Sequence, residues 1–304
     1  MSPNDIRESI TNRIIAGLEK GLLPWRRPWS SDPNSGLPSN VASKNVYRGI
    51  NPLLLELTAM DRGYSSRWWG TYRQWESLGG QVKRRPTNVP AGEWGTQIVL
   101  YKPVNRTVTD EDGDERKESF RFLKFFTVFN LDQVEGDFAA LRPSVPTEPV
   151  KPDFQVAQDM IEATGAEIHF GGDKAYYRRP SPVDSWPNHH DGDFISVPHR
   201  SQFESAKEYV CTLFHELMHW SEIRLGWTGS YAMGELIAEI GASYVAAELN
   251  VPGSDDLENS TRYLSSWLKE LRDDPSAILR AAAQASKASD YLLAFSRKPQ
   301  AIIV

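Results

Sequence analysis

Residues 205–223, SAKEYVCTLFHELMHWSEI, contain two histidines, His215 and His219, that lie four positions apart. In an α-helix this spacing places both side chains on one face, one turn apart. Both imidazoles can then reach one Zn²⁺ ion at about 2.0–2.1 Å. Glu216 follows the first histidine and is placed to act as general base on a water molecule that the metal activates. The stretch therefore predicts a metal centre with hydrolytic chemistry.

The residues around the two histidines favour a buried helix. Residues 204–208 suit a first helical turn, and no glycine or proline interrupts the pattern before Gly226. Apolar residues recur at intervals of three and four, as a helix with a buried face requires: Val210, Leu213, Phe214, Leu217 and Met218. The alternative interpretation is an ordinary core helix whose histidines are satisfied by hydrogen bonds.

A catalytic zinc ion takes three protein ligands and keeps one position for water. Residues 231–250, YAMGELIAEIGASYVAAELN, predict a second helix with three carboxylates: Glu235, Glu239 and Glu248. We predict Glu239 as the third ligand, with Glu235, one turn earlier, as the alternative. A plain solvated face is the competing interpretation of these carboxylates, but the stretch is otherwise apolar.

Other features of the region bear on how such a site would be built. Small residues would let the second helix approach the first closely: Gly241, Ala242 and Ala246. Tyr231 and Tyr244 are candidates for donating a hydrogen bond to an oxyanion, although tyrosines are commonly core residues. The predicted strand at 194–197 could offer a free edge to an extended peptide.

The composition of the chain indicates its cellular compartment and the kind of partner it can have. The chain has a single cysteine, Cys211, so no internal disulfide can form, as is usual in a reducing cytoplasm. The first 20 residues are amphipathic and charged and lack the apolar core of a signal peptide. No apolar run approaches the roughly 20 residues that cross a bilayer. We expect a cytoplasmic protein without a membrane partner.

Charge and aromatic residues are unevenly distributed along the chain. Residues 1–107 hold 15 Lys and Arg against 8 Asp and Glu, whereas the remainder holds 19 against 32. Six of the ten tryptophans fall in the basic first third. Cations beside aromatic faces are how proteins grip single-stranded nucleic acid. The candidate DNA-binding residues are Trp25, Arg26, Arg27, Trp29, Tyr47, Arg48, Arg67, Trp68, Trp69, Tyr72, Arg73, Lys83, Arg84 and Arg85. We expect about half of the aromatics to be core instead.

The order of predicted elements indicates two domains of an α+β fold. Residues 141–152 contain four prolines and predict a semi-rigid linker between domains at 1–140 and 153–304. In the first domain, strands at 96–101 and 120–130 would flank a solvated hairpin tip. In the second, a few short strands precede the histidine helix and helices follow it.

Six segments resemble the ArdC-type antirestriction proteins, which occur on conjugative plasmids and other mobile elements. The segments run in order through nearly the whole chain: 11–29 (TNRIIAGLEKGLLPWRRPW), 47–55 (YRGINPLLL), 63–75 (GYSSRWWGTYRQW), 129–133 (FNLDQ), 215–220 (HELMHW) and 235–242 (ELIAEIGA). The basic turn at 83–86 and residues 88–94 depart from the family pattern, where a shorter, glycine-containing turn is expected. This departure bears on DNA contacts at the turn.

The resemblance implies an N-terminal single-stranded DNA-binding domain joined to a C-terminal zincin-like metallopeptidase domain of the gluzincin type. The implied role is protection of incoming DNA from host restriction. Carried over by position, the metal ligands are His215, His219 and Glu239, with Glu216 catalytic. The metal would be one Zn²⁺ per chain, or another divalent ion such as Mn²⁺. A protein or peptide would be the substrate. The rival hypothesis is a DNA-binding shield whose metal site is structural or vestigial.

Overall fold

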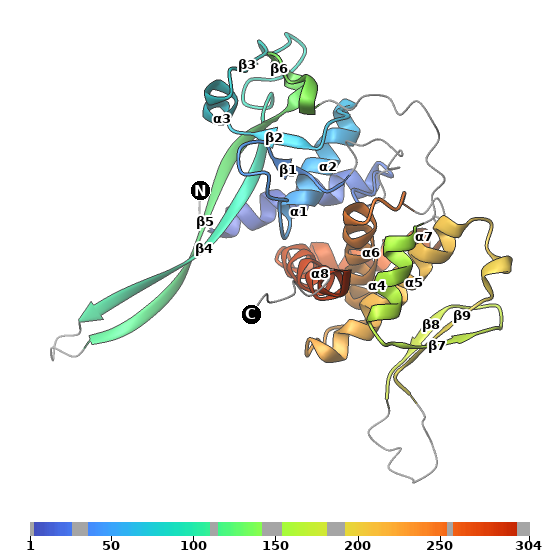
Figure 1. Ribbon diagram of the computed structural model, residues 1–304. Coiled ribbons are helices and arrows are strands. Elements are labelled where there is room, and N and C mark those ends of the chain that lie inside the picture. The colour runs from blue at the N-terminus through green and yellow to red at the C-terminus, as the bar shows by residue number, and fades with distance from the viewer. Residues whose placement is uncertain are drawn as a thin grey trace, which may run out of the picture.

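The computed structural model describes residues 3–25, 36–109, 115–141, 154–180, 192–253 and 258–296. Helices and strands are mixed along the chain, which confirms the predicted fold class (Figure 1). The α-helices are α1 (Pro3–Glu19), α2 (Asn51–Arg62), α3 (Tyr72–Ser77), α4 (Gln155–Ala163), α5 (Ala206–Arg224), α6 (Tyr231–Glu248), α7 (Glu258–Asp273) and α8 (Ala277–Leu293). The strands are β1 (Ser39–Asn40), β2 (Trp68–Gly70), β3 (Gln81–Val82), β4 (Thr96–Thr109), β5 (Glu115–Asn130), β6 (Val134–Glu135), β7 (Glu167–Phe170), β8 (Tyr176–Arg178) and β9 (Phe194–Val197).

The N-terminal half is built on a sheet of order β1-β2-β5-β4, in which only the β1–β2 pair is parallel. Helix α2 has Pro52 in its first turn, where the missing N–H costs nothing. It ends at Gly63, whose φ of 68° is the left-handed conformation that glycine adopts without strain. Thr71 and Gln74 form a capping box that starts α3. Local sequence therefore sets the ends of these elements.

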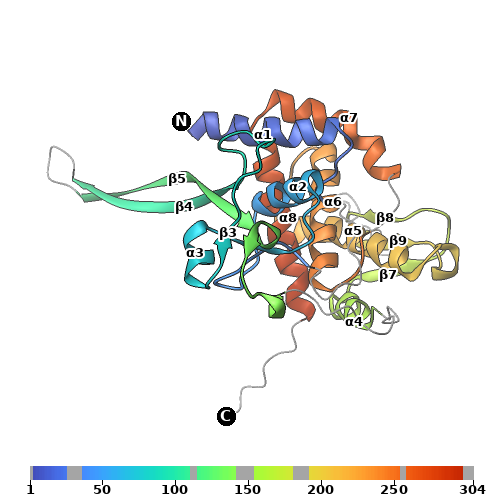
Figure 2. The same ribbon diagram turned by 90° about the horizontal axis from the view of Figure 1, so that it is seen from above.

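The β4–β5 hairpin is longer than the sequence predicts. Its strands pair without a break from Thr96 opposite Val128 to Thr109 opposite Glu115, and the hairpin projects far from the body of the molecule (Figures 1 and 2). The predicted strands, at 96–101 and 120–130, are shorter because the outer residues of the hairpin are polar and charged. A ladder is held by backbone hydrogen bonds, so polar side chains do not stop it.

The C-terminal half places a small sheet beside a group of helices. The sheet has the order β7-β9-β8, with β7 and β9 parallel and β8 and β9 antiparallel. The strand at Phe194–Val197, for which we expected a free edge, is thus the central strand, and both of its edges are occupied. Among the described residues, β8 is the edge strand that faces α5.

The two halves of the chain share their largest hydrophobic core. Helix α6 contributes Leu236, Ile237 and Ile240 to a cluster that also contains residues of α1, α2, α7 and α8. Helices α1 and α7 lie side by side (Figure 2). Polar contacts cross the same boundary, among them the Thr11 hydroxyl donating to the Pro275 carbonyl at 2.6 Å. One face of α6 is therefore packed directly on the N-terminal half.

The predicted linker at 141–152 lies almost entirely outside the described residues, and the division at 1–140 and 153–304 stays a prediction. Among the helices of the described ranges, none is both long and apolar enough to cross a membrane.

Candidate metal centre and nucleic-acid surface

Helix α5 presents the two histidines side by side. Its first turn is capped by Ser205, whose hydroxyl accepts a hydrogen bond from the Glu208 N–H at 3.2 Å. The apolar residues predicted to be buried are buried, which fixes the rotation of the helix. His215 and His219 therefore share the face opposite this core, and their Nε2 atoms are 3.2 Å apart.

Helix α6 packs tightly against α5 because its residues at the points of contact are glycines. A Cβ atom on Gly241 would lie 2.5 Å from the Met218 sulfur, and one on Gly234 would lie 3.2 Å from a carboxylate oxygen of Glu222. The predicted close approach of the two helices is confirmed at Gly241. The approach brings the acidic face of α6 to the histidines.

Three side chains converge as metal ligands: His215, His219 and Glu235. The Glu235 carboxylate lies 3.4 Å from Nε2 of His215 and 3.6 Å from Nε2 of His219. Two donors that each bind an ion at about 2.0–2.1 Å, at the tetrahedral angle, are roughly 3.3–3.4 Å apart. The two Nε2 atoms are 3.2 Å apart, Oε2 of Glu235 makes the 3.4 Å contact and Oε1 makes the 3.6 Å contact, and one ligand atom from each residue lies within 4.8 Å of the others. This triad, with two imidazoles and one carboxylate, suits a divalent ion that keeps an open position.

The structure places Glu235, the alternative ligand, against both Nε2 atoms, whereas Glu239 lies elsewhere and its assignment as third ligand stays a prediction. Glu239 contacts the other nitrogen of the ring, with its carboxylate 3.7 Å from Nδ1 of His215. It therefore lies behind His215, where it can orient the imidazole rather than reach the ion. Glu235 and Glu239 are one turn apart on the same face of α6, and only the positions of the two helices distinguish their roles.

The other histidine has a similar partner, which the sequence analysis missed. Oε1 of Glu222 lies 3.0 Å from Nδ1 of His219, and the second oxygen of Glu222 accepts a hydrogen bond from Arg179. Carboxylates behind a ligating histidine fix its tautomer and orientation. The position of Glu222, three residues after His219, could have suggested this contact. Arg179 could not have been predicted, because it comes from the segment after β8.

Glu216 lies against the edge strand. It is 7% exposed and accepts a hydrogen bond from the backbone N–H of Tyr177 in β8. Burial raises the pKa of this carboxyl, and the nearby charges of His215 and His219 lower it in part. The side chain is thus beside the proposed ion position and beside a strand that an extended peptide could join.

The electrostatics of the cluster favour a cation. Burial alone would lower the pKa of His219, but hydrogen bonds with Glu222 and Glu235 raise it to about 10. Burial alone would raise the pKa of Glu235, but its contacts with His215 and His219 hold it well below its usual range. The carboxylates that cause these shifts surround the histidines with negative charge, and a divalent ion would be stabilised there once it displaced the proton.

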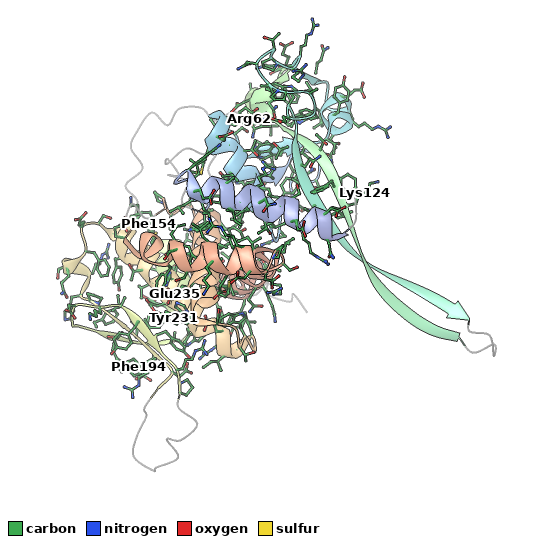
Figure 3. All side chains as sticks on the ribbon, turned by 180° about the vertical axis from the view of Figure 1, so that it is seen from behind. Arg62, Lys124, Phe154, Phe194, Tyr231 and Glu235 are labelled. Atoms are coloured by element: carbon green, nitrogen blue, oxygen red, sulfur yellow. The ribbon has the colours of Figure 1, made fainter. Side chains whose placement is uncertain are left out.

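A cavity of about 520 Å³ opens over the three converging side chains. Tyr231, at the first position of α6, is 70% exposed and lines this cavity one turn before Glu235 (Figure 3). Its hydroxyl lies 3.0 Å from that of Tyr263. Tyr244, the other tyrosine considered, is 2% exposed and donates to the Gly49 carbonyl at 3.1 Å. Of these two tyrosines, only Tyr231 is therefore placed to contact a substrate.

The structure divides the fourteen predicted DNA-binding residues into groups. Arg26, Arg27 and Trp29 lie outside the described residues. Trp25 and Trp69 are 3% and 1% exposed, so neither ring has a face on which a base could stack. These two are corrected to core residues.

Three further candidates make contacts with other parts of the protein, although Arg48 and its partner are exposed. Arg48 pairs with Asp290 at 2.6 Å, and Arg67 donates to the Ser39 hydroxyl at 2.8 Å. The Tyr47 hydroxyl accepts a hydrogen bond from the Asn40 amide at 3.0 Å. These contacts tie the side chains to neighbouring segments and leave them less free to reach a strand.

The remaining candidates stay at the surface. Tyr72 is 50% exposed, and Trp68 is half-buried with the Lys44 ammonium 4.7 Å from its ring centre. The other members of this surface group are Arg73, Lys83, Arg84 and Arg85. These residues offer both an aromatic face and cations.

We expect Trp25→Ala to lower the free energy of unfolding by about 3–5 kcal/mol, because it would empty a core site. The Trp25 ring packs edge-on against Trp267, with ring centres 5.7 Å apart. Denaturant unfolding measures the loss. The exposed Tyr72→Ala variant should change stability by less than about 0.5 kcal/mol. A Trp25 variant of normal stability would contradict the core assignment.

Two family models match the chain, and together they define its class. Residues 155–284 match a zincin-like metallopeptidase, and residues 4–129 match the N-terminal domain of anti-restriction factor ArdC. The fold and the site are therefore those of a zincin-like metallopeptidase domain that follows an ArdC N-terminal domain.

Similar proteins identify the family across the whole chain. The metal-free crystal structure of antirestriction ArdC from plasmid R388 is 36% identical, with a TM-score of 0.73 over 96% of this chain and 98% of that one. Its Mn(II)-bound structure has a TM-score of 0.70 at 35% identity, over 97% and 99% of the two chains. Protein y4eC of Sinorhizobium fredii is 36% identical over 96% of this chain and 92% of its own. The chain belongs to the ArdC family of antirestriction proteins.

A longer relative contains the same region. The DNA primase TraC of Escherichia coli is 35% identical over 96% of this chain, which spans only 20% of that protein.

The sequence-based prediction of an ArdC-type protein with a zincin-like domain is confirmed.

Proposed function

We propose that this protein binds single-stranded DNA through its N-terminal half and holds a divalent metal ion in a peptidase-type site, in the service of antirestriction. The observation that carries the proposal is the convergence of His215, His219 and Glu235, each of which offers a ligand atom within 4.8 Å of the other two. Zn²⁺ suits a site of two imidazoles and one carboxylate. The Mn(II)-bound structure of the R388 relative makes Mn²⁺ the second candidate.

Each residue around the proposed ion position has a role in one step of peptide hydrolysis. A bound ion would supply positive charge that polarises a carbonyl group and acidifies water. Glu216 takes a proton from the attacking water and delivers it to the leaving amine. Tyr231 is placed to donate a hydrogen bond to the oxygen on which negative charge develops. Among the described residues β8 is the outer strand of its sheet, and an extended peptide would join it beside the Tyr177 N–H that bonds Glu216, which makes a peptide the favoured substrate class.

The N-terminal half supports the DNA-binding part of the proposal. Its exposed cations and the faces of Trp68 and Tyr72 provide the two elements that single strands require, charge along the backbone and rings for stacking. A plain peptidase whose first half binds protein would show no salt-dependent binding to single strands.

We expect Tyr72→Ala to weaken binding to a fluorescein-labelled dT20 oligonucleotide by about 1–3 kcal/mol, the value of one stacked base. Tyr72→Phe keeps the ring and serves as the matched control. Titrations at several salt concentrations should give a steep negative slope of log K against log salt. Absence of binding by the wild-type protein, or binding indifferent to salt, would reject the DNA-binding role.

A further inference from the structure

A second cavity, of about 620 Å³, lies in the N-terminal half and shares no lining residue with the cavity of the metal centre. It is formed by α1, by the second half of α2 and by residues 91–97, which lead into β4. Arg62, at the end of α2, marks one of its walls (Figure 3). The volume lies in the range of small-molecule sites, about 300–1,000 Å³.

Two arginines line this cavity and repel one another. Arg13 donates to the Leu54 carbonyl at 3.2 Å and to the Thr58 hydroxyl, which anchors its guanidinium in the wall. Arg62 donates to the Trp94 carbonyl at 3.2 Å. Burial lowers the pKa of Arg13, the charge of Arg62 lowers it further, and Asp61 opposes both. An anion between the two guanidiniums would relieve this repulsion.

The lining holds three cations, Arg13, Lys20 and Arg62, against two carboxylates, Asp61 and Glu93, so an excess of one positive charge remains. Lys20 adds a third cation, and its pairing with Asp61 is long, at 3.9 Å, and exposed, so that it contributes little. Thr96 is 2% exposed, and its hydroxyl has no hydrogen-bond partner among the described residues. No described residue of the lining is aromatic. The cavity can therefore hold a charged, hydrogen-bonding group but cannot stack on a ring.

Hydrogen bonds join the basic turn at 83–85 to the segment beside the cavity. The Trp94 indole donates to the Lys83 carbonyl at 2.9 Å, and the carbonyl of the same Trp94 accepts from Arg62. One short segment thus connects the exposed cations of the turn with the arginines of the cavity. Cations spaced along a surface in this way are suited to the regularly spaced phosphates of a strand.

We infer that this cavity is a phosphate subsite, in which the guanidiniums of Arg13 and Arg62 bind a backbone phosphodiester of a single strand. The inference rests on the proposed single-strand binding and identifies the cavity as one place where the strand is bound. Arginine suits this role because its planar donors match phosphate oxygens in pairs. The bases would lie outside the cavity, against the exposed aromatic residues.

Titrations of labelled dT20 with the full chain test the inference, because variants that change the charge in the cavity should change the affinity. Arg62→Gln should weaken binding about fivefold at 0.1 M salt and make the salt slope shallower by about 0.7, as loss of one phosphate contact predicts for single strands. Ala16→Glu keeps a good helix former at an exposed position of α1 and adds a negative charge inside the cavity, so it should weaken binding at least as much. Thermal unfolding checks that each variant is folded.

Asn4→Glu is the matched control, because it adds the same charge at an exposed position of α1 outside the cavity, about 18 Å along the helix from Ala16. At 0.1 M salt such a charge is largely screened beyond about 10 Å, so binding should change less than about twofold. Equal effects of the two Glu variants, together with an unchanged Arg62→Gln, would overturn the inference. A second outcome would also overturn it: free dTMP binds, Ala16→Glu abolishes that binding, and all variants still bind dT20 normally. If the wild-type protein bound no strand at all, the proposed function itself would fail.

Discussion

Glu235→Gln should lower the affinity for Zn²⁺ by about 10³-fold, whereas Glu239→Gln should lower it only about 10–100-fold. The first figure follows from sharing the roughly 10–16 kcal/mol of a structural zinc site among its ligands. The second is the usual effect of losing a partner that orients a ligating histidine. The difference rests on geometry, because Glu235 faces both Nε2 atoms and Glu239 faces Nδ1 of His215.

Competition with a chromophoric chelator measures these affinities. Glu76→Gln removes an equal charge from the exposed face of α3 and should leave the affinity unchanged. The opposite order of effects, with Glu239 the more damaging loss, would return Glu239 to the position of third ligand.

Glu216→Gln should reduce peptide hydrolysis by about 10²–10⁴-fold, the usual contribution of a general base. The amide has nearly the same shape and can still accept the hydrogen bond from the Tyr177 N–H. Metal affinity and binding to dT20 should therefore stay at wild-type values. A mixture of extended peptides of varied sequence, analysed by mass spectrometry, provides the readout and identifies the sequences that are cleaved.

Cleavage that survived the change would rule out Glu216 as the base. A conjugation assay separates the enzymatic role from the shield hypothesis. Glu216→Ala should impair antirestriction if hydrolysis is part of the role. Full protection by this variant would instead favour a DNA-binding shield with a structural metal.

The histidines and Glu216 could be predicted because a single helix positions all three. Any α-helix with this spacing brings His215 and His219 together, whatever else the fold does. The third ligand depends on how α6 lies against α5. Residues one turn apart point in the same direction, so spacing does not separate Glu235 from Glu239, and the family resemblance favoured Glu239. The contacts at Gly234 and Gly241 set the offset of the helices, and they involve residues from both.

In the N-terminal half, the burial of aromatic residues could not be predicted from the local sequence either. The sequence predicts a basic region rich in tryptophan, but burial depends on partners distant in the chain. Trp25 packs on Trp267 of α7, and Trp69 packs in a cluster with Leu55 and Val128. The cavity with Arg13 and Arg62 likewise joins segments of α1, α2 and β4. A site made of such distant pieces leaves no local motif to recognise.

The shared core gives α6 two roles in one element. One face carries Glu235 and Glu239, and the other packs Leu236 and Ile240 into the core with α1 and α2. Stability of the metal centre therefore depends on the N-terminal half being folded.

Anomalous diffraction from crystals of this protein soaked in Zn²⁺ tests the central claim most directly. We expect one strong peak per chain, about 2.0–2.1 Å from Nε2 of His215, Nε2 of His219 and a carboxylate oxygen of Glu235. A peak coordinated by Glu239 instead, or no peak at these histidines, would contradict the account.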